Sequence, residues 1–309
     1  MIGRAGRSYT KSGASYVLVP SDDYRKAHNM VFGKNPPVES TMNIVENVGF
    51  HILPEIVKGR VNNETSFKEW YSKTLSFLQD KKVDYKDVID YLERNGCIGF
   101  LCNKLMATDL GKISSKFYFR PDRLFTLKNR ILEVFASSSK ETNTSEVLSW
   151  MLSYEKVIIG GVDEYGLGEY KSSVQSQGYY FEMGELLHGF VYNCLMRNHK
   201  PKWLSYVIEG ERRDIGRLLN ACRKIINSCN IDFCWQIDAL ELSILKRVPL
   251  DIGLMMLKCG IDQKGIALEI YEHGVRTKEE LDFELDYLKR NSSDNVKKFF
   301  EKREKNDIE

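Results

Sequence analysis

Apolar residues recur every three or four positions over most of this 309-residue chain, a spacing typical of helices with one buried face. Met42, Val45 and Val48 follow Ser40, a residue type that often caps a helix, and together they predict a helix over residues 40–57. The same reasoning predicts helices over residues 66–79, 84–95, 121–136, 144–155, 181–198, 211–230 and 231–246. The chain is therefore expected to be mainly α-helical.

Strand signals are confined to two short segments. Residues 97–108 place two apolar runs around a polar pair, which predicts a hairpin and a small sheet near residues 97–119. Residues 14–19 form a short β-prone run that ends at a proline, and residues 22–31 fit a short helix after it. Two adjacent prolines at positions 36 and 37 then predict a boundary, because proline excludes helix before it.

Residues 159–179 are rich in glycine and serine. A glycine-rich loop can cradle phosphate, but this segment lacks the terminal Lys-Ser/Thr pair and lies in no strand-to-helix context. A surface loop is therefore the favoured interpretation. Residues 292–309 are expected to form a mixed-charge tail that begins as a helix.

Composition fits a globular protein whose charge is balanced overall. Hydrophobic residues make up 42% and charged residues 28%, while the formal net charge is only +2. Any nucleic-acid surface must therefore be local. No apolar stretch approaches the ~20 residues of a membrane span, and no secretory signal pattern opens the sequence. We therefore expect no membrane partner and a cytoplasmic location.

The seven cysteines are scattered and lie mostly within apolar runs, which favours free thiols in a reducing compartment. Cys222, Cys229 and Cys234 lie close together in sequence, but no Cys-x-x-Cys pair or suitable histidines accompany them. We therefore predict no metal site.

The predicted helix over residues 211–230 has the best physical argument for a binding site. Its apolar residues fall in a narrow stripe at 100° per residue, and its polar residues Arg213, Arg217, Asn220 and Lys224 fall together on the opposite side. Such a row of cations with an amide can follow a phosphate backbone. The alternative interpretation is an ordinary solvated face. Trp203 and Trp235 lie nearby in sequence; they could stack on a base, although a tryptophan in a helical run more often belongs to the core.

The first seven residues carry a second basic motif. Arg4 and Arg7 lie within Gly-Arg-Ala-Gly-Arg, and fixed guanidinium groups suit the charge that spreads over a leaving γ-phosphate. The motif resembles the arginine-finger motif of superfamily 2 helicases. Further landmarks follow in the order typical of the Ski-type branch of that family: His51-Ile52-Leu53-Pro54, Trp70-Tyr71, Ala107-Thr108-Asp109-Leu110-Gly111 and Ser114-Ser115-Lys116-Phe117-Tyr118. The resemblance covers residues 1–120 well and residues 120–275 more loosely.

The resemblance implies a division of the chain into four parts. Residues 1–35 would be the remnant of a second RecA-like motor domain, residues 36–120 a winged-helix domain, and residues 121–248 a helical bundle whose helix 211–230 contacts the translocating strand. Residues 249–309 would end the chain with a degraded helix-hairpin-helix and a charged tail, because Asp262 stands where a glycine is typical. In this frame Arg4 and Arg7 are catalytic helpers.

The leading functional interpretation is the nucleic-acid-handling C-terminal part of an ATP-dependent helicase that guides a single strand past its motor domains. The sequence contains no phosphate-binding loop ending in Gly-Lys-Ser/Thr and no Asp-Glu-x-His pattern, so this chain alone is not expected to hydrolyse ATP. ATP and Mg²⁺ are expected in the complete helicase, with no cofactor in this chain and with motor domains supplied in cis or trans. The alternatives are a non-enzymatic, helicase-like scaffold, which the near-neutral charge favours, and a winged-helix transcription regulator.

Overall fold

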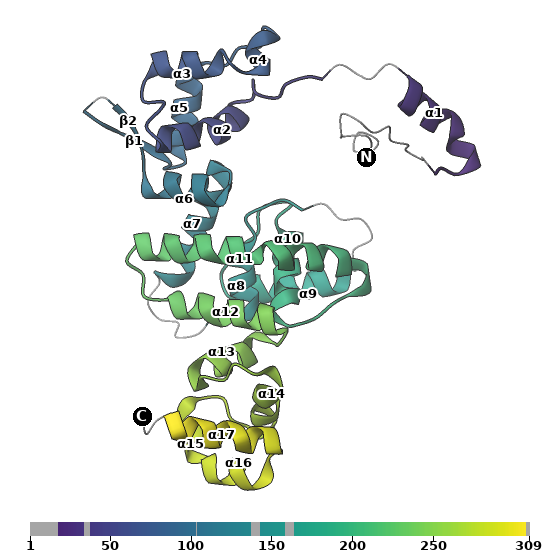
Figure 1. Ribbon diagram of the computed structural model, residues 1–309, viewed down its shortest axis with the longest axis vertical. Helices are drawn as coiled ribbons and strands as arrows, with labels where there is room; N and C mark the ends of the chain where they lie inside the picture. Colours follow the sequence, from purple (N-terminus) through teal and green to yellow (C-terminus); the bar gives the residue numbers. More distant parts are fainter. Residues whose placement is uncertain (1–17, 34–37, 103, 137–142, 158–163, 307–309) are drawn as a thin grey trace, which may run out of the picture. The chain divides into compact units, whose positions relative to one another are not determined.

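A computed structural model of the protein describes residues 18–33, 38–102, 104–136, 143–157 and 164–306 (Figure 1). The chain divides into two compact units, residues 1–41 and residues 42–309. The structure is mainly α-helical and, within the described residues, contains one two-stranded sheet, as the periodicity predicts. None of the helices in this part of the chain combines the length and apolar character that crossing a membrane requires.

The described residues of the first unit include one short helix. A 3₁₀ turn, η2 (Ser21–Asp23), leads into α1 (Tyr24–Phe32), close to the helix predicted over residues 22–31. Leu18 and Val19 form no strand. The rest of the predicted strand over residues 14–19 lies outside the described residues.

The second unit begins with helices packed around a hairpin. Its elements are α2 (Val45–Val57), α3 (Glu64–Tyr71), α4 (Leu75–Leu78), α5 (Tyr85–Arg94), β1 (Ile98–Leu101), β2 (Lys104–Ala107) and α6 (Asp109–Phe117). The strands pair antiparallel, with Ile98 opposite Ala107. The inner faces of α2, α3, α5 and the hairpin form one hydrophobic cluster. Its members include Ile52, Phe67 and Leu92.

Three predictions about this region are corrected. The helix predicted over residues 40–57 begins at Val45, with Ile44 rather than Ser40 at its N-cap position. The single helix predicted over residues 66–79 is two helices, because the chain turns at residues 72–74 and the Thr74 side chain accepts the backbone N–H of Phe77 to start α4. The sheet predicted to reach residue 119 ends at Ala107. There the Thr108 hydroxyl accepts a hydrogen bond from the Gly111 backbone N–H at 3.1 Å and caps α6. The sequence analysis assigned Thr108 to the apolar run of the hairpin and therefore did not recognise it as an N-cap.

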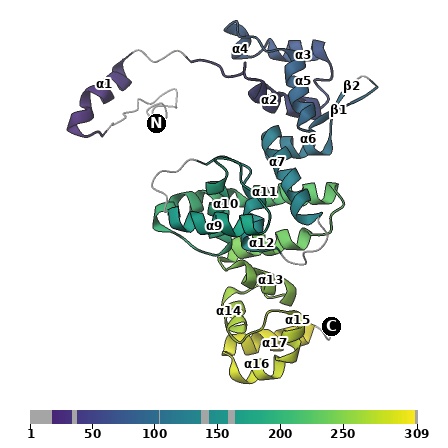
Figure 2. The same cartoon turned by 180° about the vertical axis from the view of Figure 1, so that it is seen from behind.

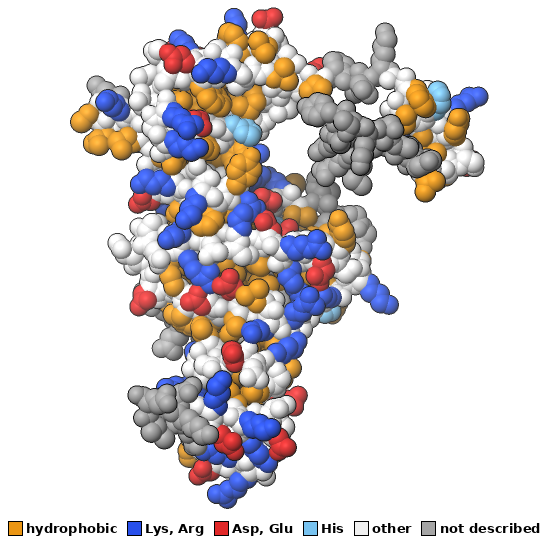
Figure 3. All heavy atoms as spheres, in the orientation of Figure 1, with side chains coloured by type: hydrophobic (Ala, Val, Ile, Leu, Met, Phe, Trp, Pro, Cys, Tyr) orange, Lys and Arg blue, Asp and Glu red, His pale blue; other side chains and the backbone are white. Residues whose placement is uncertain are grey.

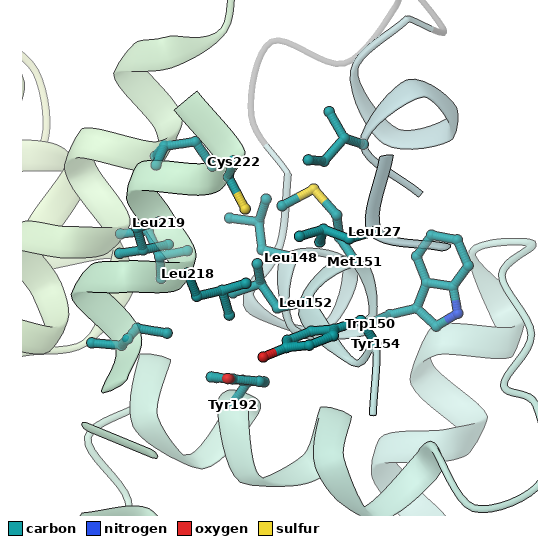
Figure 4. Close-up of a cluster of buried hydrophobic side chains, with 14 of the residues drawn as sticks. Leu127, Leu148, Trp150, Met151, Leu152, Tyr154, Tyr192, Leu218, Leu219 and Cys222 are labelled. Carbon is teal, nitrogen blue, oxygen red and sulfur yellow. The ribbon is translucent and has the colours of Figure 1, made fainter. Parts of the chain in front are cut away.

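The middle of the second unit is a helical bundle. Its elements are α7 (Pro121–Phe135), α8 (Ser145–Leu152), α9 (Glu164–Ser176), α10 (Leu186–Met196), the 3₁₀ turn η3 (Lys202–Leu204), α11 (Ser205–Ser228) and α12 (Cys234–Lys246). Both views show α8, α9 and α10 side by side, next to α11 (Figures 1 and 2). The core between them contains Leu148, Met151, Tyr192, Leu218 and Cys222 (Figure 4).

The surface loop predicted over residues 159–179 is largely the helix α9. Gly166 and Gly168 lower the helix propensity of this segment, and for that reason the sequence pattern predicted a loop. Packing overrides that propensity, since Tyr170 and Val174 are buried in the bundle core. The Tyr170 hydroxyl also forms a hydrogen bond of 2.8 Å with the Ser149 hydroxyl of α8.

The last part of the second unit is built from five short helices: α13 (Leu250–Cys259), α14 (Lys264–Glu272), α15 (Lys278–Phe283), α16 (Leu285–Asn291) and α17 (Asp294–Asn306). They enclose their own hydrophobic cluster. At Gly253 the helices α12 and α13 approach closely, since a Cβ there would lie 2.8 Å from Ser243 Cβ and 2.9 Å from the carbonyl oxygen of Ala239. The domain boundaries at residues 36, 121 and 249 stay predictions.

Candidate nucleic-acid interface

The predicted strand-contacting helix lies within α11 and begins earlier than expected. It runs over Ser205–Ser228, whereas the sequence predicts residues 211–230. Ile208 is buried and extends the apolar stripe by two turns, since it precedes Ile215 by seven residues. The residues between Ile208 and Ile215 are mostly charged, so the apolar periodicity did not indicate the first turns of the helix. On the buried face, Leu218, Cys222 and Ile225 pack into the bundle core.

The outward face of α11 carries the predicted polar residues. Arg213, Asn220 and Lys224 are exposed, and at 100° per residue they fall within a narrow arc. No ion pair engages Arg213 or Lys224 within the described part of the chain. Arg213 and Lys224 are eleven residues apart, which on a helix separates their Cα atoms by about 16 Å. The Asn220 amide nitrogen donates to the carbonyl oxygen of Gly216, one turn earlier.

Arg217 occupies a different environment from its predicted neighbours. Its guanidinium pairs with Asp214, donates from Nη1 to the carbonyl oxygens of Phe117 and Tyr118 at 3.1 Å each, and lies 4.5 Å from the ring centroid of Phe119. These partners place Arg217 half-buried against the end of α6. We therefore assign it a role in holding α11 to that helix, and a strand contact by Arg217 stays a prediction.

The flanking arginines are also paired. Arg223 donates from Nε to Asp238 of α12 at 2.7 Å and pairs with Glu241, while Arg212 pairs with Glu209 at 3.3 Å. The unpaired positive charge on the outward face of α11 is therefore carried by Arg213 and Lys224. Figure 3 shows basic and acidic side chains interspersed over the face on which α11 lies, in accord with the small net charge.

Tyr206 is a candidate contact that the sequence did not single out. Its side chain is 90% exposed, and it precedes Arg213 by seven residues, so both lie on the same side of α11. An exposed aromatic ring beside cations is the arrangement on which single-stranded bases stack. Tyr206 was missed because the helix was expected to begin at residue 211.

The two tryptophans are placed differently. Trp203 stacks on Phe190 with ring centroids 6.0 Å apart and an interplanar angle of 3°, and it packs against the bundle core. This is the core environment that the sequence favoured. Trp235 is half-buried, with the amino group of Lys258 5.8 Å from its ring centroid.

A buried polar cluster supports α11 near Arg213. The Glu211 carboxylate accepts the Tyr192 hydroxyl at 2.9 Å, and Nε2 of the buried His188 lies 3.7 Å from it. Burial opposes ionisation of Glu211, but the nearby His188 imidazole and the hydrogen bond from Tyr192 together outweigh that effect and lower the pKa of Glu211. The backbone N–H of Glu155 donates to Nδ1 of His188, which leaves Nε2 to carry the proton toward Glu211.

The predicted helix-hairpin-helix corresponds to α13 and α14. Gly260 takes a left-handed conformation at the turn, with φ of 66°, and Asp262 is exposed. A pocket of 470 Å³ beside this turn is lined by four basic side chains: Lys258, Lys278, Lys302 and Arg303. The sequence did not predict this cluster, because α17 brings Lys302 and Arg303 to the turn from the predicted tail.

Two further predicted features are the Arg4/Arg7 motif and the group of cysteines. Arg4 and Arg7 lie outside the described residues. Among the residues that the structure does describe, no three His, Cys, Asp or Glu side chains form a group that could hold a metal ion. Cys222 is buried in the core, and burial raises the pKa of its thiol to about 12.

No family model matches this chain. A stretch of 134 residues is 29% identical to the ATP-dependent DNA helicase Hel308 of Thermoplasma volcanium. The match covers 41% of this chain and 20% of that helicase, so the chain spans about a fifth of the length of the curated relative. The chain therefore contains a helicase-related region.

Proposed function

We propose that this chain is the nucleic-acid-handling part of an ATP-dependent helicase and that α11 guides a single strand past the motor domains. The observation that carries the proposal is the outward face of α11, where the exposed Tyr206, Arg213, Asn220 and Lys224 lie on one side. The similarity to a DNA helicase supports it.

In this proposal the residues of α11 have separate tasks. Arg213 and Lys224 contact two phosphates of the strand, because they are the exposed, unpaired cations of this face. Tyr206 offers a ring on which a base stacks without regard to its identity. Arg217 anchors the helix to the end of α6, so that the row stays in position.

The other parts of the chain take supporting roles in the same proposal. The helices α2, α3 and α5 with the β1–β2 hairpin form a winged helix beside the strand path. ATP and Mg²⁺ bind to RecA-like motor domains, and Arg4 and Arg7 stabilise the charge on the transferred phosphoryl group there. The four basic side chains beside the α13–α14 turn provide a second phosphate contact. The negative charge of Asp262 in the same pocket weakens the attraction for phosphate.

Salt-dependent binding of a labelled single-stranded oligothymidylate tests the proposal. Replacing both Arg213 and Lys224 with Ala should make the log–log slope of affinity against salt shallower by about 0.7 for each cation removed. The matched control replaces Lys26 and Lys171, which are exposed elsewhere and change the net charge equally. Equal loss of binding in both variants would show a non-specific charge effect and refute the assignment.

The same assay separates the alternatives. A parent chain that binds no single strand at low salt would favour the helicase-like scaffold. A preference for a particular duplex sequence would favour the winged-helix regulator. An oligouridylate of equal length, measured in parallel, would compare RNA with DNA.

A further inference from the structure

The end of α6 presents an exposed aromatic ring next to the outward face of α11. Tyr118, the C-cap residue of α6, is 60% exposed. Both views show α6 between α2 and α11 (Figures 1 and 2). The Tyr118 carbonyl oxygen accepts a hydrogen bond of 3.1 Å from Nη1 of Arg217, which lies in the same arc of α11 as Arg213 and Lys224. Tyr118 therefore adjoins the candidate nucleic-acid interface.

Tyr118 has a backbone conformation that a tyrosine rarely adopts. Its φ of 59° and ψ of 49° are left-handed, and at the end of a helix this conformation is usually taken by glycine or asparagine. Its backbone N–H donates to the carbonyl oxygen of Ser114, and Arg217 holds the carbonyl oxygens of Phe117 and Tyr118. A strained residue persists only where its surroundings fix it, and such residues cluster at functional sites. Core packing does not explain a large side chain here, because most of it is in solvent.

The orientation of the Tyr118 ring is set by α2. Phe50 of α2 is half-buried and meets the Tyr118 ring edge to face, with ring centroids 4.6 Å apart and an interplanar angle of 62°. Phe50 also contacts the ring of the exposed His51 at 5.2 Å. An edge-to-face contact covers at most one face of a ring. The exposure of Tyr118 therefore leaves a flat aromatic surface that is held in place and open to solvent.

The charges around this ring favour an anionic ligand. Lys116 is exposed two residues earlier in α6, and the exposed Arg213 lies one helical turn before Arg217 on α11. The nearby carboxylate of Asp214 is already paired with Arg217. A flat apolar surface next to exposed cations matches a nucleotide of a single strand, whose base stacks while its phosphate meets the positive charge.

We propose that Tyr118 is a stacking site for a base of the single strand that follows α11, and that Phe50 positions its ring. The inference rests on the proposed function, because the strand must lie on α11 to reach this site. Tyr206 lies two turns before Arg213, and Tyr118 is joined to α11 one turn after it. The strand would therefore stack on an aromatic ring on each side of the Arg213 contact.

The test compares two fluorescein-labelled probes of equal length, an oligothymidylate and an abasic oligomer with the same phosphates and no bases. The parent should bind the oligothymidylate more tightly. Tyr118→Gly should weaken binding of the oligothymidylate at least about fivefold, the lower limit for one stacked base, and leave binding of the abasic oligomer unchanged. The dependence of affinity on salt should stay that of the parent, because no cation is removed.

Further variants separate stacking from a structural role. Glycine accepts the left-handed conformation, so the melting temperature of Tyr118→Gly should stay close to that of the parent. Tyr118→Asn is a second ring-free variant suited to this backbone. Tyr118→Phe retains the ring and should restore binding. Tyr180→Gly, in the loop between α9 and α10, removes a tyrosine that is 68% exposed and is the matched control.

The outcomes distinguish this inference from the proposed function. If Tyr118→Gly and Tyr118→Asn bind the oligothymidylate like the parent, or weaken both probes equally, the stacking site is refuted. The proposed function then stands as long as replacing Arg213 and Lys224 still makes the salt slope shallower. A parent chain that binds neither probe would overturn both.

Discussion

At the scale of single residues, the outward face of α11 contains cations in two different environments. Arg213 and Lys224 end in solvent, whereas the Arg217 guanidinium is held by Asp214, two backbone carbonyls and the Phe119 ring. Helical spacing placed Arg217 on the correct side, but it could not show the loop after α6 that captures it, because that contact spans about a hundred residues of sequence.

Arg217→Ala should therefore destabilise the protein, by about 1–3 kcal/mol, because two carbonyl oxygens lose a charged donor. Arg213→Ala and Lys224→Ala should each change the free energy of unfolding by less than about 0.5 kcal/mol. Urea unfolding of the three variants measures the difference. Equal stability of all three would contradict the anchoring role.

The Glu211 carboxylate gives a prediction about acid. Its pKa is lowered in the folded protein, so its contribution to stability is fully present above the unfolded value and disappears as the pH falls through the folded one. Glu211→Gln should accordingly be less stable than the parent at neutral pH, and the difference should narrow below about pH 4. Urea unfolding across that range measures it; a difference that does not change with pH would exclude this linkage.

At the scale of elements, periodicity predicted those helices whose buried faces are regular. The helices expected over residues 84–95, 121–136 and 231–246 agree with α5, α7 and α12 within a few residues. Periodicity failed where the decisive contacts are tertiary, as in α9, which forms because Tyr170 and Val174 enter the bundle core despite nearby glycines.

The two faces of α11 should respond to mutation in opposite ways. Leu218 is 2% exposed and Ile225 fully buried, so Leu218→Ala or Ile225→Ala should cost about 2–5 kcal/mol through a core cavity. Strand binding by the folded fraction should be unchanged. Thermal unfolding measures the stability of each variant, and the single-strand binding assay measures its affinity. If Leu218→Ala or Ile225→Ala were as stable as the parent, the buried packing of α11 would be contradicted.

At the scale of the whole molecule, the proposed function requires motor domains that supply the nucleotide chemistry. The printed sequence has no phosphate-binding loop, and the glycine-rich candidate is mostly the helix α9. The landmarks that resemble a helicase predicted a helicase-related region, and the partial similarity to Hel308 supports that coarser prediction. The path of the strand stays a prediction.

The purified chain should accordingly show no ATP hydrolysis above background, with or without single-stranded nucleic acid. A coupled phosphate-release assay measures this, and Arg4→Ala/Arg7→Ala is the control for contaminating ATPases. Turnover that this control lacks would place nucleotide chemistry within the chain.

The close approach at Gly253 has a mechanical consequence. Ser243 and Ala239 of α12 leave no room for a side chain there, and α12 is itself tied to α11 through Arg223, Asp238 and Glu241. Because α13 packs closely on α12 and α12 is paired with α11, we expect the three helices to move as one rigid body. A force on the α13–α14 turn would then reach α11 through α12. Gly253→Val should loosen that joint, so that limited proteolysis cuts near residue 249 and releases the last five helices. In that variant the helices α12 and α13 would be flexibly connected. The outward face of α11 and the basic side chains beside the α13–α14 turn, the two candidate phosphate contacts, would then no longer move together.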